Sequence, residues 1–332
     1  MTTEYVYIRK LNAQELGFRK GEPKKAGRYI YVSKEYLSFF PPLSTVIRND
    51  HVIIDLIPPA LNHVVLTSFV YHNDKIIDNK PNGRDEFRIY LNEATDPGRN
   101  YFQPEDIIVI HRFETENGKV AYRMYCFPAA RKGTEYGLLE KLLEDKGIHE
   151  SHALLPISAI PFLKISRNID GSIVVVPEEV KEAVLEEEVS LISEEEMKKE
   201  FEFTSLIRES AFRDLLLYFY DFRCAVTGTI IRYDSLNNLE AAHIIPDELR
   251  GPAHPKNGLP LSRDMHWAFD KGFFTLNDTY EIVVHEKVIN NEVLSKIHGK
   301  KIILPEDSRA RPSSFSLNWH KDNVFGVFIK SI

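Results

Sequence analysis

The hydrophobic pattern of the first half of the chain is that of short strands. Runs of β-branched and aromatic residues recur, and turn formers such as Asn-Asp-Lys, Pro-Asn-Gly and Asp-Pro-Gly separate them. The clearest runs are residues 27–33, 51–57, 63–72, 85–91, 106–114 and 120–127. Their spacing predicts a mostly-β domain over residues 1–165, shaped as a barrel or pseudobarrel.

Two later segments carry apolar residues at helical spacing instead. Residues 133–147 form the first of these segments. The second precedes Gly228, and its apolar residues fall on one broad stripe: Leu206, Ile207, Phe212, Leu215, Leu216 and Phe219. We expect this second helix to pack against the segment that follows it.

Between the two halves lies a strongly acidic stretch. Residues 178–200 hold ten Glu and three Lys, a composition typical of a solvated helical connector. A segment that imitates DNA and covers a basic groove is the alternative. The pattern as a whole predicts an α+β protein with a β domain at 1–165, a helical acidic connector at 166–203 and a second domain at 204–332.

Charge neither demands nor excludes a nucleic-acid partner. The net charge is −7, but residues 134–205 alone carry 7 Lys+Arg against 17 Asp+Glu, whereas residues 206–332 are balanced and residues 1–133 carry a small positive excess. Salt screens the interaction of surface charges beyond about 8–10 Å, so the charge of the local surface patch decides whether phosphate binds. Both ends of the chain are therefore compatible with DNA.

The sequence has no apolar run of membrane-spanning length, and its first residues lack an apolar signal region. We therefore expect a cytoplasmic protein without a membrane partner. Its two cysteines, Cys126 and Cys224, form no CxxC pair, so we expect no structural zinc.

A constellation suited to phosphodiester hydrolysis lies in the second domain. His243 ends a strand-like run, Asn257 follows in a loop, and His266 with Asp270 occupies a helical run. A neutral histidine can serve as general base near neutral pH, and the amide of Asn257 can tie the loop backbone so that His243 is oriented. His266 and Asp270 stand at i and i+4 on one helical face and suit Mg²⁺ or Mn²⁺.

Other readings of these residues stay open. A single strand histidine is most often structural, and Asp270 can instead cap the helix or form a local salt bridge. For Asn257 a loop-capping role and the functional role nearly coincide. His254, inside the loop, is more readily an ordinary loop residue than a ligand.

The runs "AFRDLLLYFYDFRCAVTG", "LEAAHIIP", "NGLPLSRDMHWAFDKGFFTL" and "RPSSFSLNWHKDNVF" resemble, in this order, the HNH domain of bacterial McrA-type restriction endonucleases. The resemblance implies a ββα-metal fold with one divalent metal ion. It also implies His243 as general base, Asn257 as the central Asn and His266 as metal ligand. Many HNH nucleases carry Asp or His directly before the base, where this chain has Ala242. Glu240 is a candidate substitute, although the alternating pleat points it away from His243.

The N-terminal half resembles the DNA-binding pseudobarrel of EcoRII-type restriction enzymes over roughly residues 5–130, through "YIRKLNAQELGFRKGEPKKAGRYIYVSKEYLSFFPP" and "FVYHNDKIIDNKPNGRDEFRIYL". The resemblance implies two DNA-gripping arms, at residues 19–28 and 80–88. Lys20, Lys24 and Lys25 are expected to hold phosphates, and a solvated basic loop is the alternative. Arg84, Glu86 and Arg88 are the expected readers of a G·C pair, and a cross-strand salt bridge between Glu86 and Arg88 is the alternative.

These features together predict a sequence-specific, type II-like restriction endonuclease acting on double-stranded DNA and leaving 5′-phosphate and 3′-hydroxyl ends. Cleavage of both strands by one site per chain implies a homodimer or two binding events, and a cognate DNA methyltransferase is the expected host partner. Two alternatives remain: a nuclease dependent on methylated bases, and a DNA-binding regulator whose nuclease domain is inactive because of Ala242.

Overall fold

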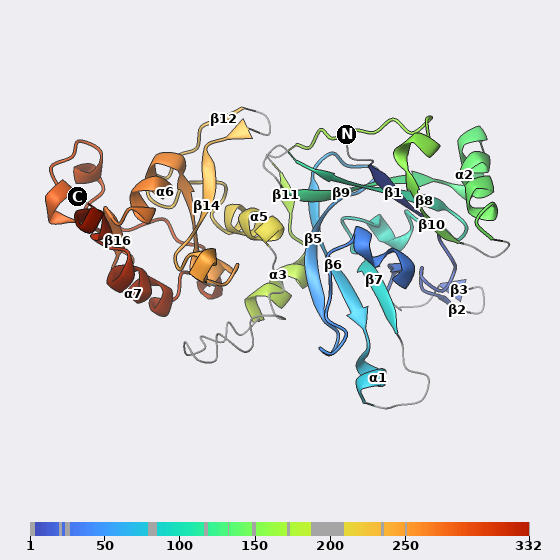
Figure 1. Ribbon diagram of the computed structural model, residues 1–332, viewed down its shortest axis with the longest axis horizontal. Coiled ribbons are helices and arrows are strands. Elements are labelled where there is room, and N and C mark those ends of the chain that lie inside the picture. Colours follow the sequence, from blue (N-terminus) through green and yellow to red (C-terminus); the bar gives the residue numbers. More distant parts are fainter. Residues whose placement is uncertain are drawn as a thin grey trace. The chain divides into compact units, whose positions relative to one another are not determined.

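In the computed structural model the chain forms two compact units, residues 1–181 and 182–332 (Figure 1). The structure describes all residues except 1–3, 20–21, 24–26, 79–84, 116–118, 132, 148–150, 171–172, 187–208, 234–235, 250 and 332. Within this described part, no helix is both long and apolar enough to cross a membrane.

Unit 1 is built on one large curled sheet of nine strands. In spatial order its main path is β10 (His152–Pro156), β1 (Tyr5–Lys10), β8 (Ile107–Glu114), β9 (Val120–Phe127), β5 (His51–Ile57), β6 (Val64–His72), β7 (Glu86–Tyr90) and β4 (Tyr29–Val32). Neighbours run antiparallel, except that β5 pairs with β9 in parallel. The ninth strand, β11 (Val174–Val175), pairs with β6 in parallel.

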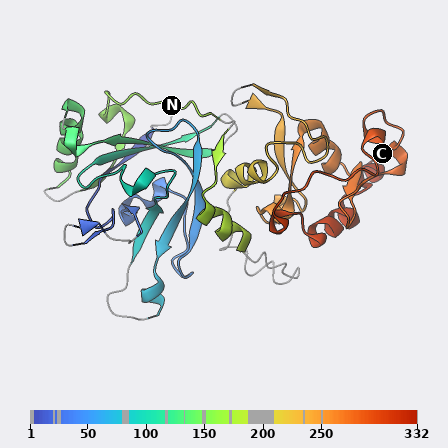
Figure 2. The ribbon, with the colours of Figure 1, turned by 180° about the vertical axis from the view of Figure 1, so that it is seen from behind.

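Apolar side chains cover both faces of the sheet around β1 and β8. On one face, Tyr7 and Ile108 join a large core with the aromatic residues of β6 and β9. On the other face, Ile8 and Val109 pack with α2 (Thr134–Glu144), whose buried residues are Tyr136, Leu139 and Leu143. Figure 2 shows the sheet and this helix from behind. Because neighbouring strand residues point to opposite faces, these strands are apolar at nearly every position.

The predicted mixed α+β class is confirmed, and so are the six predicted strand runs and the helix at 133–147. Strands β1 and β10 were not predicted. Two short strands, β2 (Phe18–Arg19) and β3 (Glu22–Pro23), pair with each other, and a short helix, α1 (Asp74–Ile77), follows β6. The predicted connector, 166–203, contributes β11 and α3 (Glu178–Glu186), and its residues 187–203 lie outside the described residues.

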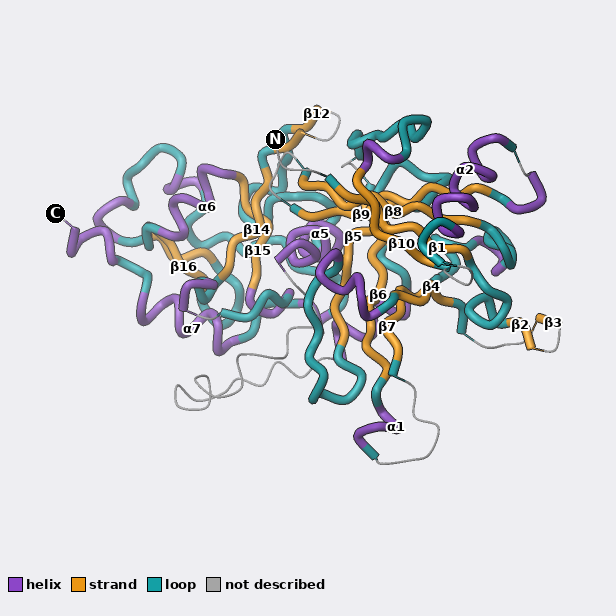
Figure 3. The backbone as a smooth tube through the Cα atoms, turned by 45° about the vertical axis from the view of Figure 1, so that its right-hand side comes forward, coloured by secondary structure: helices purple, strands orange, loops and turns teal. Residues whose placement is uncertain are grey.

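Unit 2 is built from small hairpins and helices. Helix α5 (Glu209–Phe219) packs against the hairpin of β14 (Leu239–His243) and β15 (Gly258–Ser262), and α6 (Arg263–Asp270) follows β15 directly (Figure 3). The remaining pairs are β12 (Arg232–Tyr233) with β13 (Leu236–Asn237), and β16 (Phe274–Leu276) with β17 (Ile282–Val284). Helix α7 (Ser314–Asn323) packs on β16.

The apolar stripe of α5 faces the hairpin, as the sequence predicted. Phe212, Leu215 and Leu216 are fully buried, and so are Ala211 and Leu217. Phe219 is only partly buried, and Leu206 and Ile207 lie outside the described residues. Helix α5 therefore packs against one face of the two strands β14 and β15, next to the candidate catalytic residues.

Candidate active site

The predicted residues of unit 2 lie on one hairpin and on the helix that follows it. In the antiparallel register of β14 and β15, His243 at the end of the first strand stands opposite Gly258 at the start of the second. Asn257 ends the short 3-10 turn η6 (Pro255–Asn257) just before β15, and α6 begins directly after β15. The strand-end, loop and helix residues therefore belong to one continuous ββα segment, residues 239–270.

Asn257 ties the two ends of the loop together. Its side chain is almost fully buried, and its Oδ1 accepts from the backbone N–H of Ile245 at 2.9 Å. Its Nδ2 donates to the carbonyl oxygens of Ile245 at 3.0 Å and Pro252 at 3.1 Å. The amide thus satisfies both backbone groups of a residue two positions after His243, and so holds the end of β14 in place.

His243 is half-buried and lies against an aromatic ring. Its imidazole stacks on Phe212 of α5, with ring centroids 4.2 Å apart and planes inclined by 28°. Gly258, opposite His243, makes room for this ring, because a Cβ at residue 258 would lie 2.7 Å from Phe212 Cζ. The stacking contact and the Asn257 hydrogen bonds fix His243 from two directions.

His266 and Asp270 meet on one face of α6, as their spacing predicted. His266 Nε2 lies 3.4 Å from Asp270 Oδ2, and their side chains are 24% and 54% exposed. Partial burial raises the pKa of Asp270 above its usual range; the charges of Glu240 and Glu248 act in the same direction, whereas those of His266 and Lys271 oppose it. A positive charge beside Asp270 would therefore stabilise the ionised form of its carboxylate.

Glu240 also reaches this helix face. Its Oε2 lies 2.8 Å from Nδ1 of His266, and its Oε1 lies 3.2 Å from Nε of Arg263. Glu240 is two residues before Ala242, so both point to the same face of β14. The expectation that Glu240 points away from His243 fits this arrangement, and the residue that it contacts instead is His266.

The donor set suits a hydrated divalent cation. Among the described residues, no group of three or more His, Cys, Asp or Glu side chains lies close enough to hold a metal ion by itself. Nε2 of His266 and a carboxylate oxygen of Asp270 do provide two adjacent, accessible donors. Mg²⁺ commonly keeps several waters and takes one or two carboxylates together with substrate phosphate, and these residues fit that requirement.

His320 of α7 contacts α6 and fixes its position. His320 of α7 stacks flat on Phe269, with centroids 3.7 Å apart, and its two ring nitrogens lie 3.2 Å from the Phe269 carbonyl oxygen and 3.0 Å from Thr275 Oγ1. Burial lowers the pKa of His320 to about 4, so the ring is neutral at physiological pH. Its role is to brace the helix that carries His266.

His254 belongs to the loop framework, which was the preferred interpretation from sequence. Its Nδ1 accepts from the backbone N–H of Lys256 at 3.0 Å, and Nε2 lies 3.0 Å from the carbonyl oxygen of Val184. Burial, followed by the charge of Lys256, lowers the pKa of His254 to about 4. With both nitrogens engaged by backbone groups, this side chain shapes the loop that Asn257 closes.

The comparison with protein families finds a match within unit 2. Residues 224–277 match the HNH endonuclease family, over a range that includes His243, Asn257, His266 and Asp270. This part of the chain is an HNH endonuclease domain. The predicted HNH resemblance is thereby confirmed. No curated protein matches the sequence.

Two solved structures show limited similarity to the chain. The modification-dependent TagI restriction endonuclease is 21% identical with a TM-score of 0.29, covering 37% of this chain and 40% of that one. The match therefore spans about two fifths of the length of TagI. The B3 domain of the UbaLAI restriction endonuclease, solved with cognate DNA, is 16% identical with a TM-score of 0.32, covering 47% of this chain and 89% of that one. At these values the likeness carries no argument about activity.

The predicted DNA-contact residues of unit 1 have mixed outcomes. Lys20, Lys24, Lys25 and Arg84 lie outside the described residues. Arg88 is almost fully buried; its guanidinium bonds Glu86, with Nε at 3.0 Å, and lies over the ring of Tyr29 at 3.9 Å. The geometry favours the salt-bridge interpretation, with the pair along one strand, β7, rather than across two.

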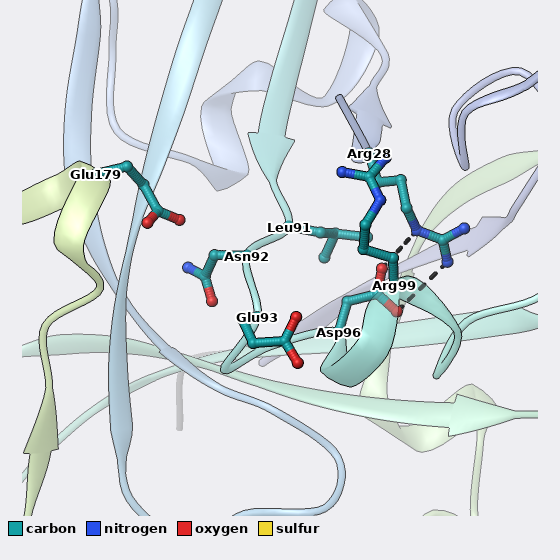
Figure 4. A pocket seen from close by; sticks show the side chains of 7 residues that line it. All are labelled: Arg28, Leu91, Asn92, Glu93, Asp96, Arg99 and Glu179. Carbon is teal, nitrogen blue, oxygen red and sulfur yellow. Dashed lines mark hydrogen bonds and ion pairs between the residues drawn. The ribbon is translucent and has the colours of Figure 1, made fainter. Parts of the chain in front are cut away.

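The end of the first predicted arm is also tied into unit 1. Arg28 is buried and bonds Asp96 through Nε at 2.5 Å, and it donates to the carbonyl oxygens of Leu16 and Phe102. Together with Asp96 it lines a cleft of about 210 Å³ (Figure 4). The other lining residues are Leu91, Asn92, Glu93, Arg99 and Glu179. Arg28 is therefore a buried structural residue of unit 1 and is not part of an exposed arm.

Proposed function

We propose that the chain is a metal-dependent DNA endonuclease whose C-terminal unit hydrolyses the phosphodiester bond. The observation that carries this proposal is the match of residues 224–277 to the HNH endonuclease family. It is supported by the placement of His243 at a strand end, Asn257 in a loop and His266 on a helix within one ββα segment.

In the proposed mechanism His243 accepts a proton from the attacking water. Stacking on Phe212 restricts the ring, and the Asn257 hydrogen bonds to Ile245 hold the strand end that presents it. His266 and Asp270 would hold Mg²⁺ or Mn²⁺, and the ion would supply positive charge to the phosphate oxygens and the leaving 3′ oxygen. The products are 5′-phosphate and 3′-hydroxyl ends.

Recognition of double-stranded DNA is assigned in this proposal to unit 1. Lys20, Lys24 and Lys25 would contact phosphates, and Arg84 would contact base edges. Since Arg88 is buried against Glu86 and Tyr29, the Glu86–Arg88 pair would anchor one end of the second arm instead of reading a base. A restriction role implies a homodimer, or two binding events, and a companion methyltransferase.

Cleavage of supercoiled plasmid with His243→Ala tests the proposal. We expect the wild-type protein to cut only with added divalent metal, and the variant to cut about 10²–10⁴ times more slowly while its DNA affinity stays unchanged. His63→Ala, a partly exposed histidine in unit 1, is the matched control and should cut normally.

The same assay separates the alternatives when the plasmid is supplied both methylated and unmethylated. Cleavage of methylated DNA alone would identify a modification-dependent enzyme. DNA binding without cleavage under any metal would identify a regulator and contradict the proposed activity. A His243→Ala variant that cuts within a few-fold of wild type would remove His243 from the role of base.

A further inference from the structure

The side chains around His266 form a connected chain of contacts across one face of α6. Arg263 Nε lies 3.2 Å from Glu240 Oε1, Glu240 Oε2 lies 2.8 Å from His266 Nδ1, and His266 Nε2 lies 3.4 Å from Asp270 Oδ2. The two carboxylates therefore meet different nitrogens of the same imidazole ring. This difference separates their roles.

We propose that Glu240 is a positioning residue for His266 rather than a metal ligand. Its carboxylate accepts a hydrogen bond from Nδ1–H, and the imidazole is thereby held in the tautomer that leaves a lone pair on Nε2, on the Asp270 side. Metal-binding histidines commonly donate their second N–H to a carboxylate, which fixes the ring and increases its basicity. The inference rests on the proposed metal-dependent function and adds a residue to it.

The geometry argues against Glu240 as a direct substitute for the missing ligand at Ala242. The two nitrogens of an imidazole point in widely divergent directions, so an ion bound at Nε2 is remote from an oxygen hydrogen-bonded at Nδ1. Glu240 lies on the same face of β14 as Ala242, two residues earlier in the strand. Its longer side chain reaches His266 on α6 from that position. It thus supports the ligand histidine from the side opposite to the ion.

Arg263 restrains Glu240 in turn. It is the first residue of α6 and contacts the oxygen of Glu240 that does not face His266. The guanidinium is 73% exposed and the Glu240 side chain 41% exposed, so this ion pair adds little to stability. Its effect is on orientation, because a carboxylate engaged at both oxygens keeps one of them directed at Nδ1.

The tautomer of His266 can be measured without metal or DNA. Long-range ¹H–¹⁵N spectra of the metal-free full chain, recorded at alkaline pH, report which ring nitrogen carries hydrogen. We expect the Nδ1–H form in wild type and loss of that preference in Glu240→Ala. An Nε2–H form in wild type, or an unchanged tautomer in Glu240→Ala, would overturn the proposal.

Mn²⁺ titration by calorimetry gives the second readout. Glu240→Ala should weaken Mn²⁺ binding by about 10–100-fold, the range found when supporting partners of ligands are removed. Glu240→Gln keeps an oxygen able to accept from Nδ1 and should weaken binding much less. If Glu240 were itself a ligand, Glu240→Gln and Glu240→Ala would lose affinity to nearly the same extent.

Glu248→Gln is the matched control for charge. Glu248 is exposed on the turn η5 (Asp247–Leu249), and its charge acts on Asp270 as that of Glu240 does. The variant removes one negative charge near the site and leaves the Glu240–His266 hydrogen bond in place. Equal losses of Mn²⁺ affinity in Glu248→Gln and Glu240→Ala would reduce the effect of Glu240 to charge alone and contradict the proposal.

The two proposals fail in different ways. If the wild-type protein shows the Nδ1–H tautomer and binds Mn²⁺ through His266 but cleaves no DNA, the proposed function fails and the role of Glu240 stands. If the protein cleaves DNA and Glu240→Ala changes neither tautomer nor Mn²⁺ affinity, the role of Glu240 fails and the nuclease proposal stands.

Discussion

Phe212 and His243 lie nearly face to face, with centroids 4.2 Å apart, although they come from a helix and a strand separated by the β12–β13 hairpin. Gly258 makes this contact feasible, since a Cβ there would approach Phe212 Cζ to 2.7 Å and Leu216 Cδ1 to 2.6 Å. The orientation of the proposed base therefore depends on the packing of α5 beneath the hairpin as well as on its own strand.

Gly258→Ala should disturb both packing and catalysis. The added methyl group has no space against the Phe212 ring, and overpacking of this kind costs about 1–3 kcal/mol of folding free energy. We expect a lower urea midpoint and a severalfold or greater loss of cleavage rate, because His243 must move with Phe212. Gly137→Ala is the control, as nothing lies within 4 Å of the added carbon. Full activity in Gly258→Ala would show that His243 tolerates a displaced Phe212.

Asn257→Asp tests the loop tie with almost no change of shape. The carboxylate would still accept from the N–H of Ile245, but it would face the carbonyl oxygens of Ile245 and Pro252 without a proton to donate. Leaving buried groups unsatisfied costs about 1–3 kcal/mol. We expect reduced stability of unit 2 together with reduced cleavage, measured by urea unfolding and plasmid assay. Loss of activity at wild-type stability would instead assign Asn257 a direct chemical role.

The strands of unit 1 could be predicted where apolar runs were bounded by turn formers, but β1 and β10 escaped detection for a physical reason. Arg9 on β1 is buried through hydrogen bonds to Glu15 and Ser151, and β1 pairs with β10 from far along the chain. The apolar run of β1 is short because Arg9 and Lys10 follow it, and only its pairing with the distant strands β10 and β8 makes it a central strand. The burial of Arg88 could not be predicted either, because it depends on contacts with Glu86 and with Tyr29 of another strand.

The candidate site could be predicted more fully than the strands of unit 1. Its hairpin and helix are contiguous in the chain, so the spacing of the site residues can be read directly from the sequence. The support around it was not, since the Phe212–His243 and Glu240–His266 contacts depend on how α5 and α6 pack on the hairpin. One signal was nonetheless present: Glu240 and Ala242 share a strand face by the alternation of the pleat.

Asp270→Asn should raise the Mg²⁺ or Mn²⁺ concentration needed for half-maximal cleavage at least about tenfold, since even the partners of ligands act on this scale. Asp270 Oδ2 is 3.4 Å from His266 Nε2, and the change removes its charge while keeping its size. The unfolding midpoint should change little. An unchanged metal titration at normal activity would leave Asp270 as a structural residue of the helix end.

Acid should weaken unit 2 through its buried histidines His254 and His320. The pKa values of His254 and His320 are each lowered to about 4 by burial, below the ordinary value of about 6.5. Between these two pH values the unfolded chain binds protons that the folded chain does not. Their contribution is therefore full above about pH 6.5 and is lost as the pH falls toward 4. The shift corresponds to a loss on the order of 3 kcal/mol per histidine.

Trp267 and Trp319 are the only tryptophans of the chain, and both belong to unit 2, so tryptophan fluorescence during urea unfolding reports on that unit. His254→Asn keeps an acceptor for the Lys256 N–H but loses the bond to Val184. We expect it to be less stable than wild type at pH 7.5 and to show a shallower decline in stability between pH 6.5 and 4, because one titrating group is gone. His63→Asn, in unit 1, should keep the wild-type slope. A slope in His254→Asn equal to that of wild type would mean that His254 does not titrate differently in the folded and unfolded states.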